Sequence, residues 1–168
     1  MTSGPKLANS ATDALGKLAR FRDVGLRPTA ARLAVWSAVE RHPHAQADEI
    51  AASAREQLGA VSTAAIYQVL NALTAAGLLR RVEPAGSPAR YETRVADNHH
   101  HVVCRRCGLI GDVDCAVGAA PCLEPSALGG FTLDEAEVTW WGLCGSCQGD
   151  TASSVASFPE IGGSVAPG

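Results

Sequence analysis

The clearest pattern of apolar and polar positions in this chain lies between Ser62 and Gly77. Its apolar residues are spaced i, i+3, i+4 and i+7, and they are Ile66, Val69, Leu70 and Leu73. This spacing puts them on one face of a helix. Ser62 is a good N-cap and Gly77 a good C-terminal stop. The pattern therefore predicts an amphipathic helix over residues 63–76.

Three earlier segments also show an apolar face with helical periodicity. The predicted helices cover residues 13–23, 29–40 and 46–58. Gly25 follows the first helix and Gly59 follows the third, and glycine is typical of helix ends. Residues 1–12 are mostly small and polar, which predicts a disordered N-terminus.

After Gly77 the helical period gives way to strand-like alternation. Residues 78–82 and 90–93 are predicted strands, and the proline-bounded segment 84–88 is a turn between them. Three helices, the last amphipathic, followed by a two-stranded wing are typical of a winged helix-turn-helix domain. We assign this domain to residues 13–93.

The polar residues of this domain suit contact with DNA. On the predicted recognition helix 63–76 they are Thr63, Tyr67, Gln68 and Asn71, which can reach base edges or phosphates. The wing adds phosphate-binding candidates, namely Arg80, Arg81 and Arg90. A plain solvated helix face is the alternative interpretation, and the wing directly after the helix favours DNA binding.

The second half of the chain is predicted to mix strands with short helices. The expected strands cover residues 109–113, 130–133 and 137–141. Pro121 and Pro125 limit any helix within residues 116–128 to a short one. Residues 97–148 are thus a small α/β domain, and residues 149–168, rich in Gly, Ser, Ala and Pro, are a flexible tail.

Charge and hydropathy indicate which binding partners and which cellular compartment suit the chain. The net charge is −3, yet residues 1–91 hold 11 basic and 7 acidic side chains while residues 92–168 hold 3 basic and 10 acidic. A basic first half suits DNA and an acidic second half suits cations, although the imbalance is modest. The N-terminus lacks a signal-peptide pattern and the chain has no membrane-length apolar run. We expect a cytoplasmic protein with reduced thiols.

Two Cys-x-x-Cys pairs carry the strongest chemical signal. They are Cys104 with Cys107 and Cys144 with Cys147. Two disulfides or scattered thiols are the alternatives, but reduced thiols and the doubled spacing favour a four-thiolate structural zinc site.

The run His99, His100 and His101 precedes the first cysteine pair. In a strand His99 and His101 point to one face and His100 to the other. We predict a second metal site that includes His99 and His101, against the alternative of a polar, half-exposed strand without metal.

Six segments together resemble the ferric uptake regulator (Fur) family of metal-dependent bacterial repressors, over roughly residues 13–148. They are Leu26-Arg27-Pro28-Thr29, residues 44–50, Ser62 to Tyr67, Arg90-Tyr91-Glu92, Asn98 to Cys107, and Cys144 to Cys147. The resemblance implies an α+β homodimer in which a winged helix precedes an α/β dimerisation domain. It also implies a repressor rather than an enzyme, which binds palindromic, AT-rich operators in double-stranded DNA.

The resemblance also implies two ligand sets. The structural zinc falls on Cys104, Cys107, Cys144 and Cys147, and a regulatory Fe²⁺ or Mn²⁺ falls on His44, Glu92, His99, His101 and Asp112. Glu92 matches only with a one-residue insertion, so Asp97 is the alternative ligand. A zinc hydrolase is the competing class, but four cysteines leave no open position on the zinc.

The signal is expected to be peroxide. Peroxide-sensing members resemble this chain at Asp112, and residues 90–122 resemble actinobacterial regulators linked to catalase-peroxidase genes. The resemblance then implies iron-catalysed oxidation of His44 or His99. Sensing of iron or another divalent metal is one alternative. A thiol switch is another, because Cys115 and Cys122 are either a redox pair or ordinary packing residues.

Overall fold

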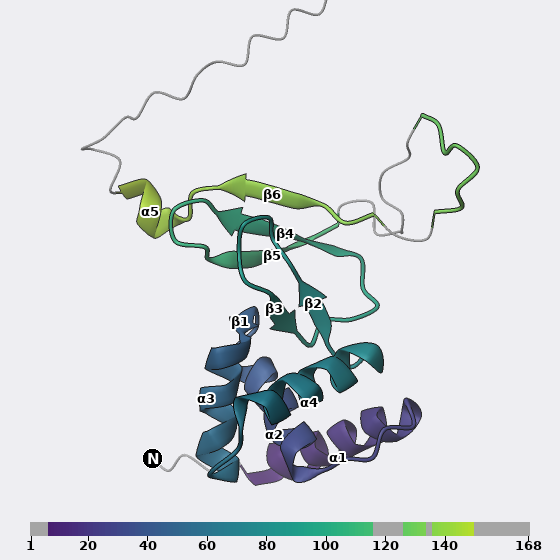
Figure 1. Cartoon of the computed structure of the whole chain (residues 1–168), viewed down its shortest axis with the longest axis vertical. Coiled ribbons are helices and arrows are strands. Elements are labelled where there is room, and N and C mark those ends of the chain that lie inside the picture. Colours follow the sequence, from purple (N-terminus) through teal and green to yellow (C-terminus); the bar gives the residue numbers. More distant parts are fainter. Residues whose placement is uncertain (1–6, 116–125, 134–135, 150–168) are drawn as a thin grey trace, which may run out of the picture. The chain divides into compact units, whose positions relative to one another are not determined.

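The structure is a computed structural model that describes residues 7–115, 126–133 and 136–149, with side chains from residue 15 onward (Figure 1). It divides into two compact units. The first holds the residues up to His99 together with 114–136, and the second holds 100–113 and the residues from Glu137 onward. Each unit is described by itself.

The first unit contains the four long helices of the chain's described part. They are α1 (Leu7–Asp23), α2 (Ala30–Arg41), α3 (Ala47–Leu58) and α4 (Thr63–Ala75). Three of them match the predicted ranges within one residue at each end. The exception is α1, which begins at Leu7 rather than at residue 13, so the helix includes residues 7–12 of the segment that was expected to be disordered. Residues 7–12 carry no repeating apolar face, so periodicity gave no sign of this part of the helix.

Local capping sets where these helices begin. The Ser62 hydroxyl accepts a hydrogen bond from the Ala65 N–H at 3.2 Å, and the Thr29 hydroxyl accepts one from the Arg32 N–H at 3.3 Å. The backbone N–H of Gln46 donates to the Glu49 carboxylate at 2.7 Å. Each such bond satisfies an amide that the first helical turn leaves without an intrahelical partner.

The helices bury one apolar core. Its fully buried side chains include Phe21, Val35, Trp36, Ile50, Ile66 and Leu70. The Phe21 and Trp36 rings meet edge to face with centroids 5.3 Å apart. Burial of each such side chain contributes about 1.5–3 kcal/mol, so this core holds the recognition helix α4 on the domain through its apolar stripe.

A three-stranded antiparallel sheet completes the winged helix. Its strands are β1 (Ala45–Gln46), β2 (Arg80–Val82) and β3 (Arg90–Glu92), in the order β1-β3-β2. Ala45 pairs with Tyr91, and Arg81 also pairs with Tyr91 from the other side. The predicted wing is thus confirmed, and β1 adds a strand that joins the start of α3 to β3.

The second unit is built on another three-stranded sheet. Its strands are β4 (His99–Cys104), β5 (Ile110–Asp114) and β6 (Thr139–Gly142), in the order β5-β4-β6. β4 and β6 run parallel, and Cys104 pairs with Gly142. The short helix α5 (Gly145–Gly149) follows directly.

Parts of the predicted second half need correction. Residues 130–133 do not form a strand; Gly129 and Gly130 make a turn with φ of +55° and +90°, and a chain in that conformation cannot extend. Residues 126–128 are not helical, and the rest of the predicted short helix lies outside the described residues. Gly149 belongs to α5, and the remainder of the predicted tail also lies outside.

Among the described residues, no single helix is long and apolar enough to cross a membrane; α3 and α4 meet that test only as a pair, across a bend of 105°.

Candidate metal centres and nucleic-acid interface

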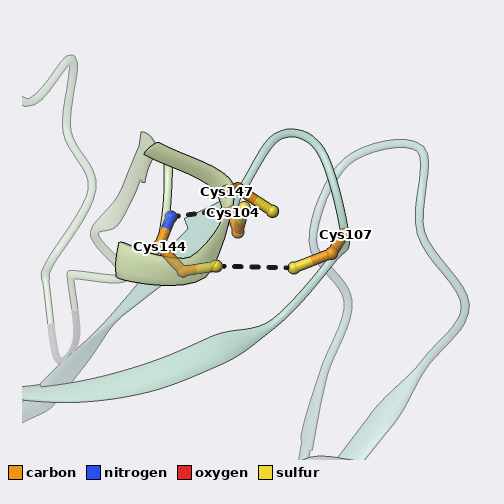
Figure 2. Close-up of side chains that lie close together, drawn as sticks. All are labelled: Cys104, Cys107, Cys144 and Cys147. Carbon is orange, nitrogen blue, oxygen red and sulfur yellow. Dashed lines mark hydrogen bonds between the residues drawn. The ribbon is translucent and has the colours of Figure 1, made fainter. Parts of the chain in front are cut away.

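Four cysteines of the second unit point their sulfur atoms toward a common centre (Figure 2). Cys104 ends β4 and Cys107 lies on the turn that follows, while Cys144 precedes α5 and Cys147 lies within it. All four Sγ atoms lie within 4.8 Å of one another. The Sγ atoms of Cys107 and Cys144 are 3.7 Å apart.

This geometry fits one tetrahedral metal ion. A zinc–thiolate bond of about 2.3 Å implies sulfur atoms about 3.8 Å apart in a regular tetrahedron. The spacing of Cys107 and Cys144 is close to that value, and the donors come from two tight turns. Four soft thiolates and no open position are typical of structural zinc sites.

The protein surroundings shift the pKa values of two of the four thiols in opposite directions. The backbone N–H groups of Cys107 and Cys144 donate to the Cys104 sulfur and lower the pKa of that thiol to about 6. Burial, with the neighbouring thiols, raises the pKa of Cys147 to about 12. A divalent cation at the centre favours the thiolate form of every ligand, so it would remove this inequality.

One arginine ties the two halves of the cysteine cluster together. The Arg106 guanidinium donates to the backbone carbonyl of Cys147 at 2.9 Å. Its neighbour Arg105 lies over the Trp141 ring, 5.3 Å from the centroid. These contacts hold the Cys104 turn against α5 and β6 without using a thiol.

The first unit holds a separate polar cluster, made of His44, Glu92, His99 and Asp97. The Glu92 carboxylate lies between two imidazoles, with Oε2 2.9 Å from the Nε2 of His44 and Oε1 3.1 Å from the Nε2 of His99. Glu92 and His99 are almost fully buried. The second nitrogen of His99, Nδ1, lies 2.7 Å from the Asp97 carboxylate.

The backbone around His44 is fixed by β3. His44 has a φ of +61°, which is uncommon for a residue with a side chain. Its N–H donates to the Tyr91 carbonyl at 2.8 Å, and its carbonyl accepts from the Arg90 guanidinium at 3.3 Å. Adjacent residues of β3 thus hold the backbone and the imidazole of His44.

The donor set of this cluster fits a divalent metal. Imidazole and carboxylate donors suit Fe²⁺ and Mn²⁺, whereas the four thiolates suit zinc. Of the residues in this cluster, the His44 imidazole and the Glu92 carboxylate belong to a group of residues that could hold a metal ion. Sequence reasoning ranked Glu92 as its weakest match, and the structure brings Glu92 together with His44 and His99.

The remaining predicted ligands belong to the second unit. His101 is fully buried on β4, and its Nε2 lies 3.8 Å from the Asp112 carboxylate on β5. His100 packs edge to face on Trp140, with ring centroids 5.4 Å apart. All three histidines of the run are buried, so a half-exposed polar strand does not describe it.

The predicted DNA-binding residues of α4 form an exposed face. Thr63, Tyr67, Gln68 and Asn71 are all exposed. Tyr67 and Asn71 also line an open groove of about 630 Å³. The groove continues onto the wing through Arg81, Glu83 and Ser87. A groove between a recognition helix and a wing suits a nucleic-acid backbone.

The three wing arginines differ in their contacts. Arg81 pairs with Glu83 at 2.6 Å on the exposed edge of the groove. Arg80 lies 3.9 Å from the buried Glu92, and Arg90 donates to the His44 carbonyl. Arg81 is therefore the wing arginine best placed for a phosphate, while Arg80 and Arg90 also face the polar cluster.

Sequence reasoning missed Arg55 on α3. Its guanidinium donates to the Val61 carbonyl at 3.1 Å and to the Thr63 hydroxyl at 2.9 Å. These bonds fix the turn into α4.

The predicted redox candidate Cys115 is half-buried, and its N–H donates to the Asn98 carbonyl at 3.3 Å. Its proposed partner Cys122 lies outside the described residues.

A winged helix, a four-cysteine cluster and a histidine–carboxylate cluster define a metal-binding, DNA-binding protein. Residues 23–135 match the Ferric uptake regulator family, and the chain belongs to that family. Its members are metal-responsive transcriptional regulators that bind DNA as dimers.

Relatives extend the match over most of the chain. Transcriptional regulator FurA of Mycobacterium tuberculosis is 57% identical over 136 residues, which cover 80% of this chain and 92% of that protein. Ferric uptake regulation protein 1 of Mycolicibacterium fortuitum is 59% identical over 129 residues, covering 77% and 80%. The crystal structure of the Vibrio cholerae ferric uptake regulator has a TM-score of 0.60 at 24% identity and covers 76% of this chain and 99% of that one. That structure supports the fold.

Proposed function

We propose that this protein is a metal-dependent repressor whose binding to its operator is relieved by peroxide. The observation that carries the proposal is the buried cluster in which the Glu92 carboxylate touches the Nε2 atoms of His44 and His99. Its donors differ in kind from the four thiolates, so the two clusters suit different metals and different tasks.

The proposed ligand sets follow the two kinds of donor. Zinc is held by the four cysteines and stabilises the second unit, because metal-binding energy is also folding energy. Fe²⁺ or Mn²⁺ is held by His44, Glu92, His99, His101 and Asp112. His44 and Glu92 belong to the unit that carries the recognition helix, so binding of the regulatory metal is coupled to binding of the operator. Operator DNA must then tighten metal binding by the same factor.

The proposed partner is a palindromic, AT-rich operator in the cytoplasm. A homodimer presents two α4 helices related by a two-fold axis, so its half-sites must be related in the same way. Thr63, Tyr67, Gln68 and Asn71 meet the bases. The wing arginines, Arg81 above all, meet the phosphates.

Peroxide acts on the protein by oxidising a histidine ligand of the regulatory metal. Fe²⁺ held there would supply the one-electron chemistry that activates hydrogen peroxide beside its ligands, and it would regain its electron as the oxidised ring forms; Mn²⁺ would do this poorly. The imidazole of His44 or His99 gains one oxygen atom and becomes 2-oxo-histidine, and the other oxygen atom leaves as water. The oxidised ring no longer offers the same ligand nitrogen, so the regulatory site loses affinity for metal and the operator is released.

Mass spectrometry of peroxide-treated protein tests this proposal. Samples loaded with Fe²⁺ or Mn²⁺ receive mild peroxide and then go to peptide mapping and gel-shift assay. We expect one added oxygen on a peptide that contains His44 or His99, with iron only. We also expect a loss of DNA binding that thiol reductant does not restore.

Other outcomes select the alternatives. The relatives named as ferric uptake regulation proteins favour iron sensing as the second candidate. No modification at micromolar peroxide, with operator binding that follows Fe²⁺ concentration, would establish that function. Modification confined to Cys115, Cys122 or the zinc ligands, with binding recovered by reductant, would establish a thiol switch.

A further inference from the structure

The two ring nitrogens of His99 face two different carboxylates. Nε2 lies 3.1 Å from Oε1 of Glu92, and Nδ1 lies 2.7 Å from Oδ1 of Asp97. The His99 side chain is fully buried. Because the imidazole is buried, its contacts with Glu92 and Asp97 bear directly on which nitrogen carries hydrogen and which nitrogen can bind a metal.

Asp97 is itself held in place by Arg94. The Arg94 guanidinium donates to Oδ2 of Asp97 at 2.7 Å, which leaves Oδ1 for His99. It also donates, at 2.8 Å, to the carboxylate of Asp114, which is the last residue of β5. Arg94 thus bridges the two carboxylates, and a shift of the loop before β4 would break charge-assisted hydrogen bonds.

We propose that Asp97, clamped by Arg94, is a positioning residue that keeps the hydrogen of His99 on Nδ1 and so reserves Nε2 for the regulatory metal. Metal-binding histidines in proteins commonly donate their other N–H to a carboxylate, which fixes the ring orientation and raises the basicity of the ligand nitrogen. This inference rests on the proposed metal site that contains His99.

The geometry separates this role from that of a ligand. Asp97 contacts Nδ1, whereas Glu92, a proposed ligand of the regulatory metal, lies beside Nε2. The two nitrogens point outward from different edges of the ring, so a metal on Nε2 is directed away from Asp97. Glu92 also contacts the second imidazole, from His44, and Asp97 instead makes its other contact with Arg94. The sequence alternative in which Asp97 replaces Glu92 as ligand does not match these contacts.

The test compares Asp97→Ala with Asp114→Ala in the full-length, zinc-loaded protein. Both variants remove a carboxylate from Arg94, but only Asp97 touches His99. Mn²⁺ affinity is measured from the free-ion paramagnetic resonance signal. We expect Asp97→Ala to weaken Mn²⁺ binding by about 10–100-fold, the usual range for such supporting residues. Asp114→Ala should bind Mn²⁺ like the wild type, and both should keep their zinc.

Nitrogen-15 NMR of the histidine side chains supplies the readout that a general loss of stability would not mimic. Wild-type protein without regulatory metal should show a slowly exchanging hydrogen on the Nδ1 of His99, and Asp97→Ala should lose it. Unchanged Mn²⁺ affinity in Asp97→Ala would overturn the proposal. So would weaker binding with the Nδ1 signal intact, because that result would make Asp97 a direct ligand. Wild-type protein that binds no Mn²⁺ would refute the proposed function, while the Nδ1 signal would still test the contact with Asp97.

Discussion

The Nε2 atom of His44 lies 2.9 Å from Oε2 of Glu92, although the two residues are 48 positions apart. His44 precedes β1 and α3, and Glu92 ends β3. The contact therefore connects the segment just before α3, the first helix of the helix-turn-helix, to strand β3 of the wing. A change at this contact, such as metal binding, acts on both parts of the DNA-binding unit at once.

Replacing Glu92 with glutamine should abolish metal-dependent operator binding while keeping the fold. The amide has the same shape, but it lacks the charge that faces two imidazoles. Metal-to-operator coupling is typically about 5–150-fold in affinity, and we expect it to vanish. Gel shifts with and without Mn²⁺ measure it. Glu56→Gln, on the exposed side of α3, is the matched control. Full metal dependence in Glu92→Gln would exclude Glu92 from the site.

Replacing Cys144 with serine should remove the structural zinc and loosen the second unit. The wild type should hold about one tightly bound zinc per chain at the four-thiolate site. Loss of one thiolate also loses folding energy, so the melting temperature should fall. Cys115→Ser is the control, because Cys115 lies outside the cysteine cluster. Elemental analysis and calorimetry read the result. A Cys144→Ser protein with both zinc and melting temperature intact would contradict the assignment.

Removing the Tyr67 side chain should weaken specific DNA binding. The residue is 44% exposed on α4 and lines the groove beside the wing. If it reads a base, Tyr67→Ala should cost about 1–3 kcal/mol of discrimination. Competition gel shifts with operator and scrambled DNA separate specific from general losses. Tyr67→Phe keeps the ring and isolates the hydroxyl. Equal losses on both DNAs would assign Tyr67 to the backbone instead.

The Arg81–Glu83 pair should set the strength of the wing's phosphate contact. Glu83 neutralises Arg81 at 2.6 Å within the groove, and both side chains are exposed. Arg81→Ala should weaken binding on every sequence and reduce the salt slope by about 1. Glu83→Gln should strengthen binding, because it removes a carboxylate that repels phosphate. Affinities measured over a salt series check both. If the slope of Arg81→Ala stays at the wild-type value, Arg81 makes no phosphate contact.

The helices were predictable because their signals are local. Ser62 and Gly77 bound α4 in the sequence, and the cap that Ser62 makes is the one its side chain predicts. β1 was not predictable, since two residues carry no period and its pairing with Tyr91 joins segments far apart in the chain. The predicted strand at 130–133 failed because its apolar residues follow two glycines in a turn that only φ values reveal.

The cysteine cluster was predictable from spacing, whereas the contacts that position the histidine side chains were not. Cys-x-x-Cys places two thiols on one turn whatever surrounds it. The contacts of Asp97, Arg94 and Arg55 depend on how loops fold back, and no spacing rule covers them. The wing arginines show the same limit: residue type predicted three phosphate contacts, and the structure gives Arg80 and Arg90 partners in the domain itself.

The left-handed backbone of His44 has a consequence for how substitutions at this position should be ranked. A residue with a side chain at φ of +61° is strained by about 1–2 kcal/mol relative to glycine. In a mutational scan read out by folding stability, glycine at position 44 should therefore score above alanine. Alanine outranks glycine at the exposed positions of the neighbouring helix. Read out by repression, both replacements should score as inactive, so the two scans together would distinguish a strained ligand from an ordinary structural residue.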